Sequence, residues 1–297
     1  MSTILPYISI CIATYNGASK ILKTLDAIAA NTVLPEEIII FIDGSTDHTL
    51  AELARFRYQD LLKVSYSENI GRASARNAAA QIAKNELILF LDDDILIPEN
   101  TLETHAEFHL KNQGKILTCP TLTITSDNDF SNFKRSLEYH WNKEASKNTD
   151  VTFSAAFFSI PKIIFEQTGG FHAGLSDAED YEFGWRLRKK NISIIVNSTL
   201  IGTHNDPVSC TSFIQRNRQY AKANQLLVEQ QLLENNKYVP VAPNRFKKLL
   251  FYCFTQVFLV RLVDRNFFKW LYRPLRFKLY DYISAGFIYY YPEKPLE

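Results

Sequence analysis

Three consecutive aspartates, Asp92, Asp93 and Asp94, directly follow the apolar run at residues 87–91. The run has the length and composition of a buried strand. Like charges at the end of such a strand repel one another unless a cation neutralises them, and a divalent metal ion can do so. In open α/β sheets, ligands bind at the carboxyl ends of the strands. The cluster therefore predicts a metal site that holds a phosphorylated ligand, and a solvated turn is the alternative.

The elements around the cluster alternate between strand and helix patterns. Strand-like runs lie at residues 7–13, 38–42, 63–66 and 87–91, with helical patterns between them, for example at residues 72–84. This alternation is typical of βαβ units that form a parallel sheet. The second strand stops at Asp43-Gly44, so two of the predicted strands end in aspartate.

The bulk composition bounds the class of protein. With 297 residues, 46% of them hydrophobic and 22% charged, the chain can form one large α/β domain with an appendage, or two smaller domains. A net charge of +1 gives no case for nucleic acid, so no nucleic-acid partner is expected. The four cysteines lie far apart, the N-terminus lacks a signal-peptide pattern, and no apolar run reaches the length of a membrane span. We therefore expect a cytoplasmic protein, either free or peripheral on the inner face of the cell membrane.

Several short motifs follow one another along the chain. They comprise residues 9–17, residues 35–47, Asn69-Ile70-Gly71, Ala75-Arg76-Asn77, the aspartate cluster, Gly169-Gly170-Phe171 and Glu179-Asp180. In this arrangement the chain resembles glycosyltransferase family 2 over about residues 7–206. The resemblance implies a GT-A fold, which is a nucleotide-binding α/β/α sandwich with a mixed, mostly parallel central sheet. It also implies sugar transfer from a nucleotide donor with inversion, usually with Mg²⁺ or Mn²⁺, in the synthesis of a polysaccharide, lipopolysaccharide or other glycoconjugate.

The nucleotide-sugar contacts implied by the resemblance fall in the first half of the chain. They are Ala13, Tyr15, Asp43, Arg72, Arg76, Asp92 and Asp93. A carboxylate at Asp43 can accept the imide N–H of uracil, which favours a UDP-sugar as the donor. The family often has a further aspartate at the position of Ile42, and this chain departs from the pattern there. Arg72 and Arg76 share one helix face and suit phosphate or base recognition, with solvated surface arginines as the alternative.

The metal ligands implied by the resemblance are Asp94, Asp92 and His204. Asp92 and Asp94 have the spacing of the family's DxD element, and a hard cation with oxygen ligands would neutralise the diphosphate leaving group. His204 follows the strand-like residues 193–196, where a histidine completes the metal shell in many GT-A enzymes. A purely structural histidine is the alternative.

Glu179-Asp180 resembles the family's ED motif, whose aspartate is the catalytic base of inverting members. A carboxylate must remove the proton of the acceptor hydroxyl as that oxygen attacks the anomeric carbon, and Asp180 is predicted in this role. Glu179 would then orient the acceptor or the loop. The alternative is an acidic cap favoured by the helix dipole. Gly170, Phe171 and Trp185 flank the motif and are predicted on the acceptor side.

Two other functions compete with sugar transfer. A sugar nucleotidyltransferase expects a glycine-rich and basic loop after the first strand, whereas residues 14–19 contain one glycine and no basic residue. A nucleotide-sugar-binding protein without turnover is the second competitor. The retained acids oppose this second alternative, and Ile42 is the feature that supports it.

The C-terminal residues 241–297 are predicted to form an amphipathic helical extension of a catalytic domain at residues 1–240. Within that domain, about residues 1–115 would bind the nucleotide-sugar and about residues 116–240 the acceptor. Residues 245–291 hold 16 of the 39 aromatic residues of the chain, interleaved with lysine and arginine. This pattern favours docking on an anionic membrane surface, beside a glycan or lipid-linked acceptor. A helical cap on the catalytic domain and an oligomer interface are the alternatives.

Overall fold

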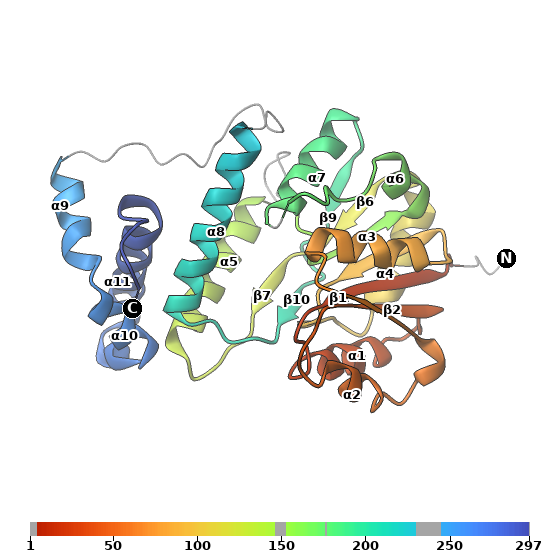
Figure 1. Cartoon of the computed structure of the whole chain (residues 1–297), viewed down its shortest axis with the longest axis horizontal. Helices are drawn as coiled ribbons and strands as arrows, with labels where there is room; N and C mark the ends of the chain where they lie inside the picture. Colours follow the sequence, from red (N-terminus) through yellow and green to blue (C-terminus); the bar gives the residue numbers. More distant parts are fainter. Residues whose placement is uncertain (1–4, 146–152, 176, 230–244, 297) are drawn as a thin grey trace. The chain divides into compact units, whose positions relative to one another are not determined.

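The main sheet of the computed structural model has the strand order β3-β2-β1-β4-β8-β6-β9 (Figure 1). The model describes residues 5–145, 153–175, 177–229 and 245–296. The strands of this sheet are β1 (Ile8–Thr14), β2 (Glu37–Asp43), β3 (Leu62–Ser67), β4 (Leu87–Leu91), β6 (Ile116–Thr118), β8 (Phe157–Pro161) and β9 (Ile194–Val196). β8 runs antiparallel to its neighbours β4 and β6, and the remaining paired strands are parallel. The predicted mixed, mostly parallel sheet is confirmed.

Helices cover both faces of this sheet because its strands are apolar on both sides. In β1, Ile8, Ile10 and Ile12 point to one core and Cys11 to the other, as the two-residue period of a strand requires. The first core also contains residues of α1 (Ile21–Ala29), α2 (Thr49–Leu53) and α4 (Thr101–Lys111). The second contains residues of α3 (Arg72–Ile82), α6 (Lys162–Gln167) and α7 (Glu179–Lys189). The predicted α/β/α sandwich is therefore confirmed.

A small second sheet begins directly after the aspartate cluster. Its strand order is β5 (Ile95–Leu96), β10 (Gly202–His204) and β7 (Thr121–Thr123). The antiparallel register of β5 and β10 sets His204 opposite Ile95. This pairing brings His204, more than a hundred residues away in sequence, to the end of β4.

A polar cluster lies within the core between α4 and the main sheet. The Ser159 hydroxyl on β8 lies 2.6 Å from His105 Nδ1 and 2.7 Å from His109 Nε2. Cys119 Sγ lies 3.4 Å from the other nitrogen of His105, Nε2. Burial lowers the pKa of His105 to about 3, with His109 adding to the effect, and burial lowers the pKa of His109 to about 4. Both imidazoles are therefore neutral at ordinary pH.

A second compact unit combines residues 123–140 with residues 206–297. Its elements include most of α5 (Asp129–Ala145), together with α8 (Cys210–Glu229), α9 (Arg245–Phe254), α10 (Val257–Asp264), the 3₁₀ turn η2 (Phe267–Trp270), α11 (Arg273–Ala285) and the π-helical turn η3 (Gly286–Tyr290). Phe130 and Phe133 of α5 pack with Tyr280 of α11 in one apolar core. The Tyr280 hydroxyl donates to Asp129 Oδ2 at 2.8 Å, which fixes the start of α5 on α11.

The first unit consists of residues 1–122 and 141–205, and it contains all the residues predicted for the functional site. The predicted domain boundary between residues 240 and 241 lies outside the described residues and stays a prediction. None of the helices that the structure describes is long and apolar enough to cross a membrane.

Candidate active site

The aspartate cluster lies where β4 ends, next to the end of β1. The Thr14 hydroxyl donates to Asp93 Oδ2 at 2.5 Å, and Lys20 Nζ lies 2.9 Å from Asp93 Oδ1. Burial raises the pKa of Asp93 to about 6, and the charge of Asp94 adds to this rise against the opposing effect of Lys20. Asp93 is thus the buried anchor of the cluster, tied to the first βα turn rather than open to solvent.

Asp94 and His204 converge at the same edge. His204 Nδ1 lies 3.4 Å from Asp94 Oδ1, and Lys20 Nζ lies 3.9 Å from Asp94 Oδ2. Burial raises the pKa of Asp94, but the hydrogen bond and charge of His204 together with Lys20 outweigh it, and the pKa falls to about 2. The carboxylate is consequently ionised and in place to receive a cation.

This donor set suits a divalent metal ion that is shared with a ligand. Magnesium sites commonly use one or two protein carboxylates and take their remaining oxygens from phosphate and water, and imidazole is a common ligand of transition metals. Across the described part of the chain, no group of three or more acidic, histidine or cysteine side chains is arranged to hold a metal. Asp94 and His204 alone could supply only part of the coordination shell of such an ion.

Arg76 connects the aspartate cluster with the ED motif. Its side chain extends from α3, is 4% exposed, and places Nη2 2.5 Å from Asp92 Oδ1 and Nη1 2.7 Å from Glu179 Oε1. Burial lowers the pKa of Arg76, but Asp92 and Glu179 outweigh it and keep the guanidinium charged. One buried cation thus holds the two predicted acidic motifs together. Arg72, one turn earlier and partly exposed, lies 4.0 Å from the same Glu179 oxygen.

Asp43 at the end of β2 is also buried and has a structural partner. Its Oδ1 accepts the backbone N–H of Ile70 at 2.6 Å, which fixes the turn that precedes α3. Gly44 has a φ of +73°, and a Cβ there would lie 2.6 Å from the backbone nitrogen of Asn69, so only glycine fits. Asp43 therefore positions the turn from which Arg72 and Arg76 follow.

The ED motif opens α7. Ala178, immediately before it, adopts the left-handed conformation with a φ of 61°, which costs on the order of 1 kcal/mol for a residue with a Cβ. Glu179 is buried against Arg76, whereas Asp180 is partly buried and its Oδ1 accepts the N–H of Tyr181 at 2.8 Å. Burial raises the pKa of Asp180 to about 6, with Glu179 adding to the rise and Arg76 opposing it. A carboxyl group with this pKa is suited to accept a proton near neutral pH.

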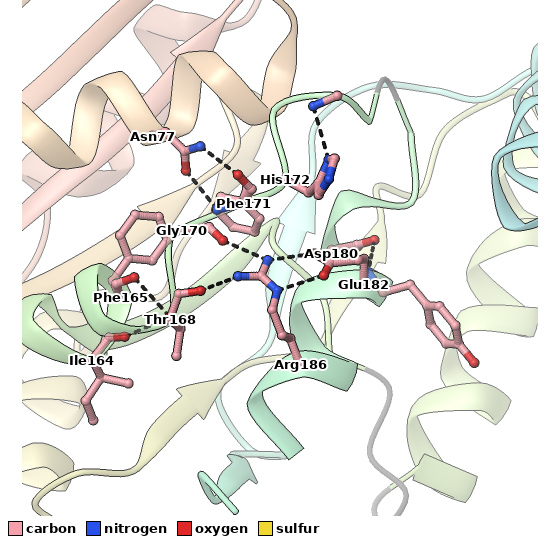
Figure 2. Close-up of polar contacts among 12 residues, drawn as sticks. Asn77, Ile164, Phe165, Thr168, Gly170, Phe171, His172, Asp180, Glu182 and Arg186 are labelled. Atoms are coloured by element: carbon pink, nitrogen blue, oxygen red, sulfur yellow. Dashed lines mark hydrogen bonds and ion pairs between the residues drawn. The ribbon is translucent and has the colours of Figure 1, made fainter. Parts of the chain in front are cut away.

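Arg186 ties α7 to the glycine loop that precedes the ED motif (Figure 2). Its guanidinium contacts Glu182 on its own helix at 2.7 and 2.6 Å. It also donates to the carbonyl oxygens of Thr168 and Gly170, the latter at 2.8 Å. The loop and the helix that carries Asp180 are therefore held in one arrangement.

Asn77 ties the same loop to α3. Its side-chain amide donates to the carbonyl of Phe171 at 2.8 Å and accepts the Phe171 N–H at 2.8 Å, as Figure 2 shows. Gly170 has a φ of +65°, and a Cβ there would lie 2.7 Å from Asn77 Oδ1. The Phe171 ring is 2% exposed and packs on Phe90 and Phe183. Gly170 and Phe171 are thus both buried, and their backbone groups are taken up by Asn77 and Arg186.

Ion pairs hold two groups of the predicted residues together. Arg72, Arg76, Asp92 and Glu179 form the first; in the second, Lys20 contacts Asp93 and Asp94, and His204 contacts Asp94. Ala13 is partly buried on β1, Tyr15 is exposed beside it, and Trp185 is partly exposed on α7 with Lys189 Nζ 4.1 Å from its ring centroid.

Sequence reasoning missed the parts played by Lys20 and Thr14. Both act on Asp93, which lies more than seventy positions further along the chain. The available signal was the polar residue at the end of the first strand and the nearest lysine after it, both of which must face the same sheet edge as the aspartate cluster.

The chain is similar in sequence to curated glycosyltransferases. A chondroitin synthase from Pasteurella multocida is 27% identical over 78% of the chain and 24% of its own length. A poly(ribitol-phosphate) beta-glucosyltransferase from Bacillus spizizenii is 30% identical over 63% of the chain and 30% of its own length. The chain spans about a quarter of the length of the first curated relatives it matches.

Two solved structures show the fold. A mannosyltransferase from Pyrobaculum calidifontis in complex with GDP-Man and Mn²⁺ aligns with a TM-score of 0.63 at 18% identity, over 96% of this chain and 86% of that one. TarS from S. aureus in complex with UDP-GlcNAc aligns with a TM-score of 0.54 at 20% identity, over 94% and 90% of the two chains. The predicted GT-A fold is confirmed by these neighbours.

The family model described as glycosyl transferase family 2 matches residues 9–180, from β1 to the aspartate of the ED motif. This match covers more than half of the chain and includes every predicted site residue except His204 and Trp185. The prediction of a glycosyltransferase-type enzyme is thereby confirmed at the level of the family. The chain belongs to glycosyltransferase family 2.

Proposed function

We propose that the chain transfers a sugar from a nucleotide-diphospho-sugar to an acceptor hydroxyl with inversion, and that UDP is the nucleotide. The observation that carries the proposal is the buried Arg76, which contacts both Asp92 at the donor edge and Glu179 beside Asp180. An enzyme that displaces a leaving group in line needs its base and its leaving-group site in fixed relation. Arg76 supplies that relation through one rigid guanidinium group.

The donor would bind at the carboxyl ends of β1, β2 and β4. Ala13, Tyr15 and Asp43 would contact the nucleoside. Asp43 Oδ1 already accepts the N–H of Ile70, so its second oxygen would accept the imide N–H of uracil. Arg72, whose side chain is partly exposed, would contact the base or phosphate from the first turn of α3. Asp92 and Asp93 would contact the ribose of the donor and keep the aspartate cluster in place.

Asp94 and His204 are the residues that would hold a divalent cation, and Asp92, two positions before Asp94, is the third predicted ligand. Such an ion, Mn²⁺ or Mg²⁺, would neutralise the diphosphate leaving group as the glycosidic bond breaks. Lys20 lies 2.9 Å from Asp93 and would keep that carboxylate compensated whether or not the ion is bound.

Asp180 would act as the general base. Its carboxylate takes the proton of the acceptor hydroxyl while that oxygen attacks the anomeric carbon from the face opposite the diphosphate, which inverts the configuration in one step. Its pKa of about 6 leaves the group ionised at neutral pH and still basic enough to share the proton in the transition state. Glu179 and Arg186 hold the helix start and the glycine loop on either side of the base.

The acceptor is proposed to be a glycan, either free or linked to a lipid, in the synthesis of a polysaccharide or related glycoconjugate. Relatives named chondroitin synthase, hyaluronan synthase and poly(ribitol-phosphate) beta-glucosyltransferase support this class of acceptor. The partly exposed Trp185 would face the acceptor on the side of α7, whereas the buried Gly170, whose carbonyl accepts from Arg186, would shape the loop.

Nucleotide binding is the first test. Thermal unfolding would be measured with UDP, GDP, dTDP and CDP, each with and without Mn²⁺, because a ligand that binds only the folded state raises stability by mass action. We expect UDP to stabilise the chain selectively and only with metal present. Stabilisation by GDP instead would reassign the nucleotide, and no response to any nucleotide would refute the donor site.

Turnover is the second test and separates an enzyme from a binding protein. Release of UDP from UDP-sugars would be followed in the presence of candidate glycan acceptors, for the native chain, Asp180→Asn and the exposed control Asp60→Asn. The proposal expects transfer by the native chain and the control, and none by Asp180→Asn. Selective UDP binding in a chain that never turns over would favour the non-catalytic alternative.

A further inference from the structure

An exposed apolar patch lies where η2 leads into α11, far in sequence from the catalytic motifs. Its members are Phe267, Trp270, Tyr272 and Leu275, which are 55%, 74%, 72% and 63% exposed. We call these four residues the 267–275 patch. Large apolar side chains usually bury most of their surface, so three aromatic residues and a leucine exposed within nine positions mark an interaction surface.

The patch stands on a firmly held base. The Asn266 side chain accepts the N–H of Asp129 at 2.8 Å, and Arg276 donates to the carbonyls of Lys269 at 2.7 Å and Leu271 at 3.0 Å. Phe268 and Phe277, neighbours of the patch in sequence, pack against the apolar core of the second unit. Phe268 and Phe277 therefore stabilise the unit from inside, and the members of the patch face outward.

Basic residues predominate around the patch, with Asp264 and Asp281 just outside it in sequence. The exposed Arg265, Lys269, Arg273 and Lys278 lie among its members in sequence, and residues 265–280 contain no aspartate or glutamate. None of these four cations forms an ion pair with a carboxylate of the residues that the structure describes. Arg276, the fifth basic residue of this stretch, is paired with Asp129, which leaves the other four to act outward.

We infer that the 267–275 patch docks this chain on an anionic lipid bilayer. Tryptophan and tyrosine rings favour the boundary between headgroups and acyl chains, and each nearby lysine or arginine adds attraction to an anionic surface. A second copy of the chain is a poorer occupant, because a two-fold dimer through this patch would bring the same four cations face to face. A bilayer would place a lipid-linked acceptor at the surface on which the enzyme rests, and this last point rests on the proposed function.

The test uses the full chain and vesicles of defined composition. Co-sedimentation would be measured with vesicles of phosphatidylcholine, and with vesicles of phosphatidylcholine mixed with phosphatidylglycerol, at low and high salt. We expect binding to the anionic vesicles only, weakened by salt. Trp270→Ala/Tyr272→Ala should lower the affinity by roughly tenfold or more.

A matched control is available in Tyr139 and Trp141, which are 57% and 56% exposed on α5. Tyr139→Ala/Trp141→Ala removes the same two ring types and should leave vesicle binding unchanged. Trp270→Phe should keep binding but remove most of the blue shift in tryptophan emission on anionic vesicles, because Trp270 is the ring that enters the interface.

The inference is overturned if the native chain ignores anionic vesicles, or if the patch variant binds them as tightly as the control variant. A native dimer that the patch variant converts to monomer in sedimentation analysis would assign the patch to self-association instead. Stabilisation by UDP and Mn²⁺ would be measured in every variant. If neither the native chain nor any variant is stabilised by UDP and Mn²⁺, while the native chain and the control variant still bind anionic vesicles, the proposed function is refuted and the docking surface stands.

Discussion

Replacing Asp180 by asparagine should abolish sugar transfer and at the same time stabilise the fold. The Asp180 carboxyl is partly buried at the start of α7, and its pKa is raised from an ordinary value of 3.8 to about 6, first by burial and then by Glu179. A raised pKa means that the folded chain disfavours the ionised carboxylate. Asparagine keeps the shape, and its Oδ1 can still accept the N–H of Tyr181. The substitution therefore removes the charge and loses only the hydrogen bond from the N–H of Ala155, which an amide nitrogen cannot accept.

The size of the effect follows from linkage. Each pKa unit corresponds to about 1.4 kcal/mol, so a rise from 3.8 to about 6 is worth about 3 kcal/mol, and about 2 kcal/mol after allowance for the solvent that reaches this partly buried group. Below the unfolded pKa both states are protonated and the cost vanishes. As the pH rises through the folded value the cost becomes complete. Asp180→Asn should therefore gain about 2 kcal/mol at pH 8 and almost nothing near pH 3.5.

Urea unfolding of native and variant chains at several pH values measures this difference, with the exposed Asp60→Asn as the control. In parallel, the transfer rate of the native chain should rise with pH through about 6, because the base must be ionised to accept a proton. Two results would refute the reasoning about Asp180. Transfer by Asp180→Asn near the native rate would remove Asp180 as the base. A stability difference that is the same at low and high pH would show that the carboxyl is not held in the disfavoured state.

Three further substitutions test the geometry around the base. Arg76→Met leaves Asp92 and Glu179 without their shared cation and should lower the free energy of unfolding by about 3–5 kcal/mol. Arg76→Lys should recover only part of this loss, because an ammonium group lacks the guanidinium fork. Urea unfolding measures both, and a loss below about 1 kcal/mol for Arg76→Met would contradict the bridge. Asp94→Ala should remove the Mn²⁺-dependent part of the thermal stabilisation by UDP. His204→Ala should weaken Mn²⁺ affinity roughly tenfold or more. Unchanged metal dependence in both variants would show that the metal binds at another site. Gly170→Ala should lower the free energy of unfolding by about 1–3 kcal/mol, since its φ of +65° and the contact with Asn77 both oppose a Cβ. Adding Asn77→Ala should relieve the contact but not the backbone strain. A double-mutant cycle in which the two losses simply add would contradict the clash.

Local pattern was enough to predict the strands and the acids at their ends. The run before Asp92 is apolar throughout, so it could only be a buried strand, and β4 was found with its bounds unchanged. Asp43 was placed correctly at the end of β2 for the same reason. The hydrogen bond from Ile70 to its carboxylate was not predictable, because it depends on how a loop 27 residues further along the chain folds back.

Long-range pairing explains what the sequence could not reveal about the site. Arg76 was predicted to recognise phosphate or base, with a solvated surface arginine as the alternative. It is instead buried between Asp92 and Glu179, the latter 103 residues away. His204 could be suspected only from the strand before it, since β5 and β10 are two and three residues long and their pairing leaves no periodic signal. The joining of Phe130 on α5 to residues after 206 in one core likewise depends on packing alone.

The cluster of His105, His109 and Ser159 constrains how this core can change over evolutionary time. A single hydroxyl proton can satisfy one imidazole nitrogen, so the other imidazole must itself carry a hydrogen where it meets Ser159. The two neutral histidines are thereby fixed in complementary tautomers by one serine. Loss of the serine alone would leave buried imidazole nitrogens without a partner, and loss of one histidine would leave a cavity beside a polar group. Among relatives, we therefore expect these three positions either to be conserved together or to be replaced together by apolar residues, and not to be substituted singly.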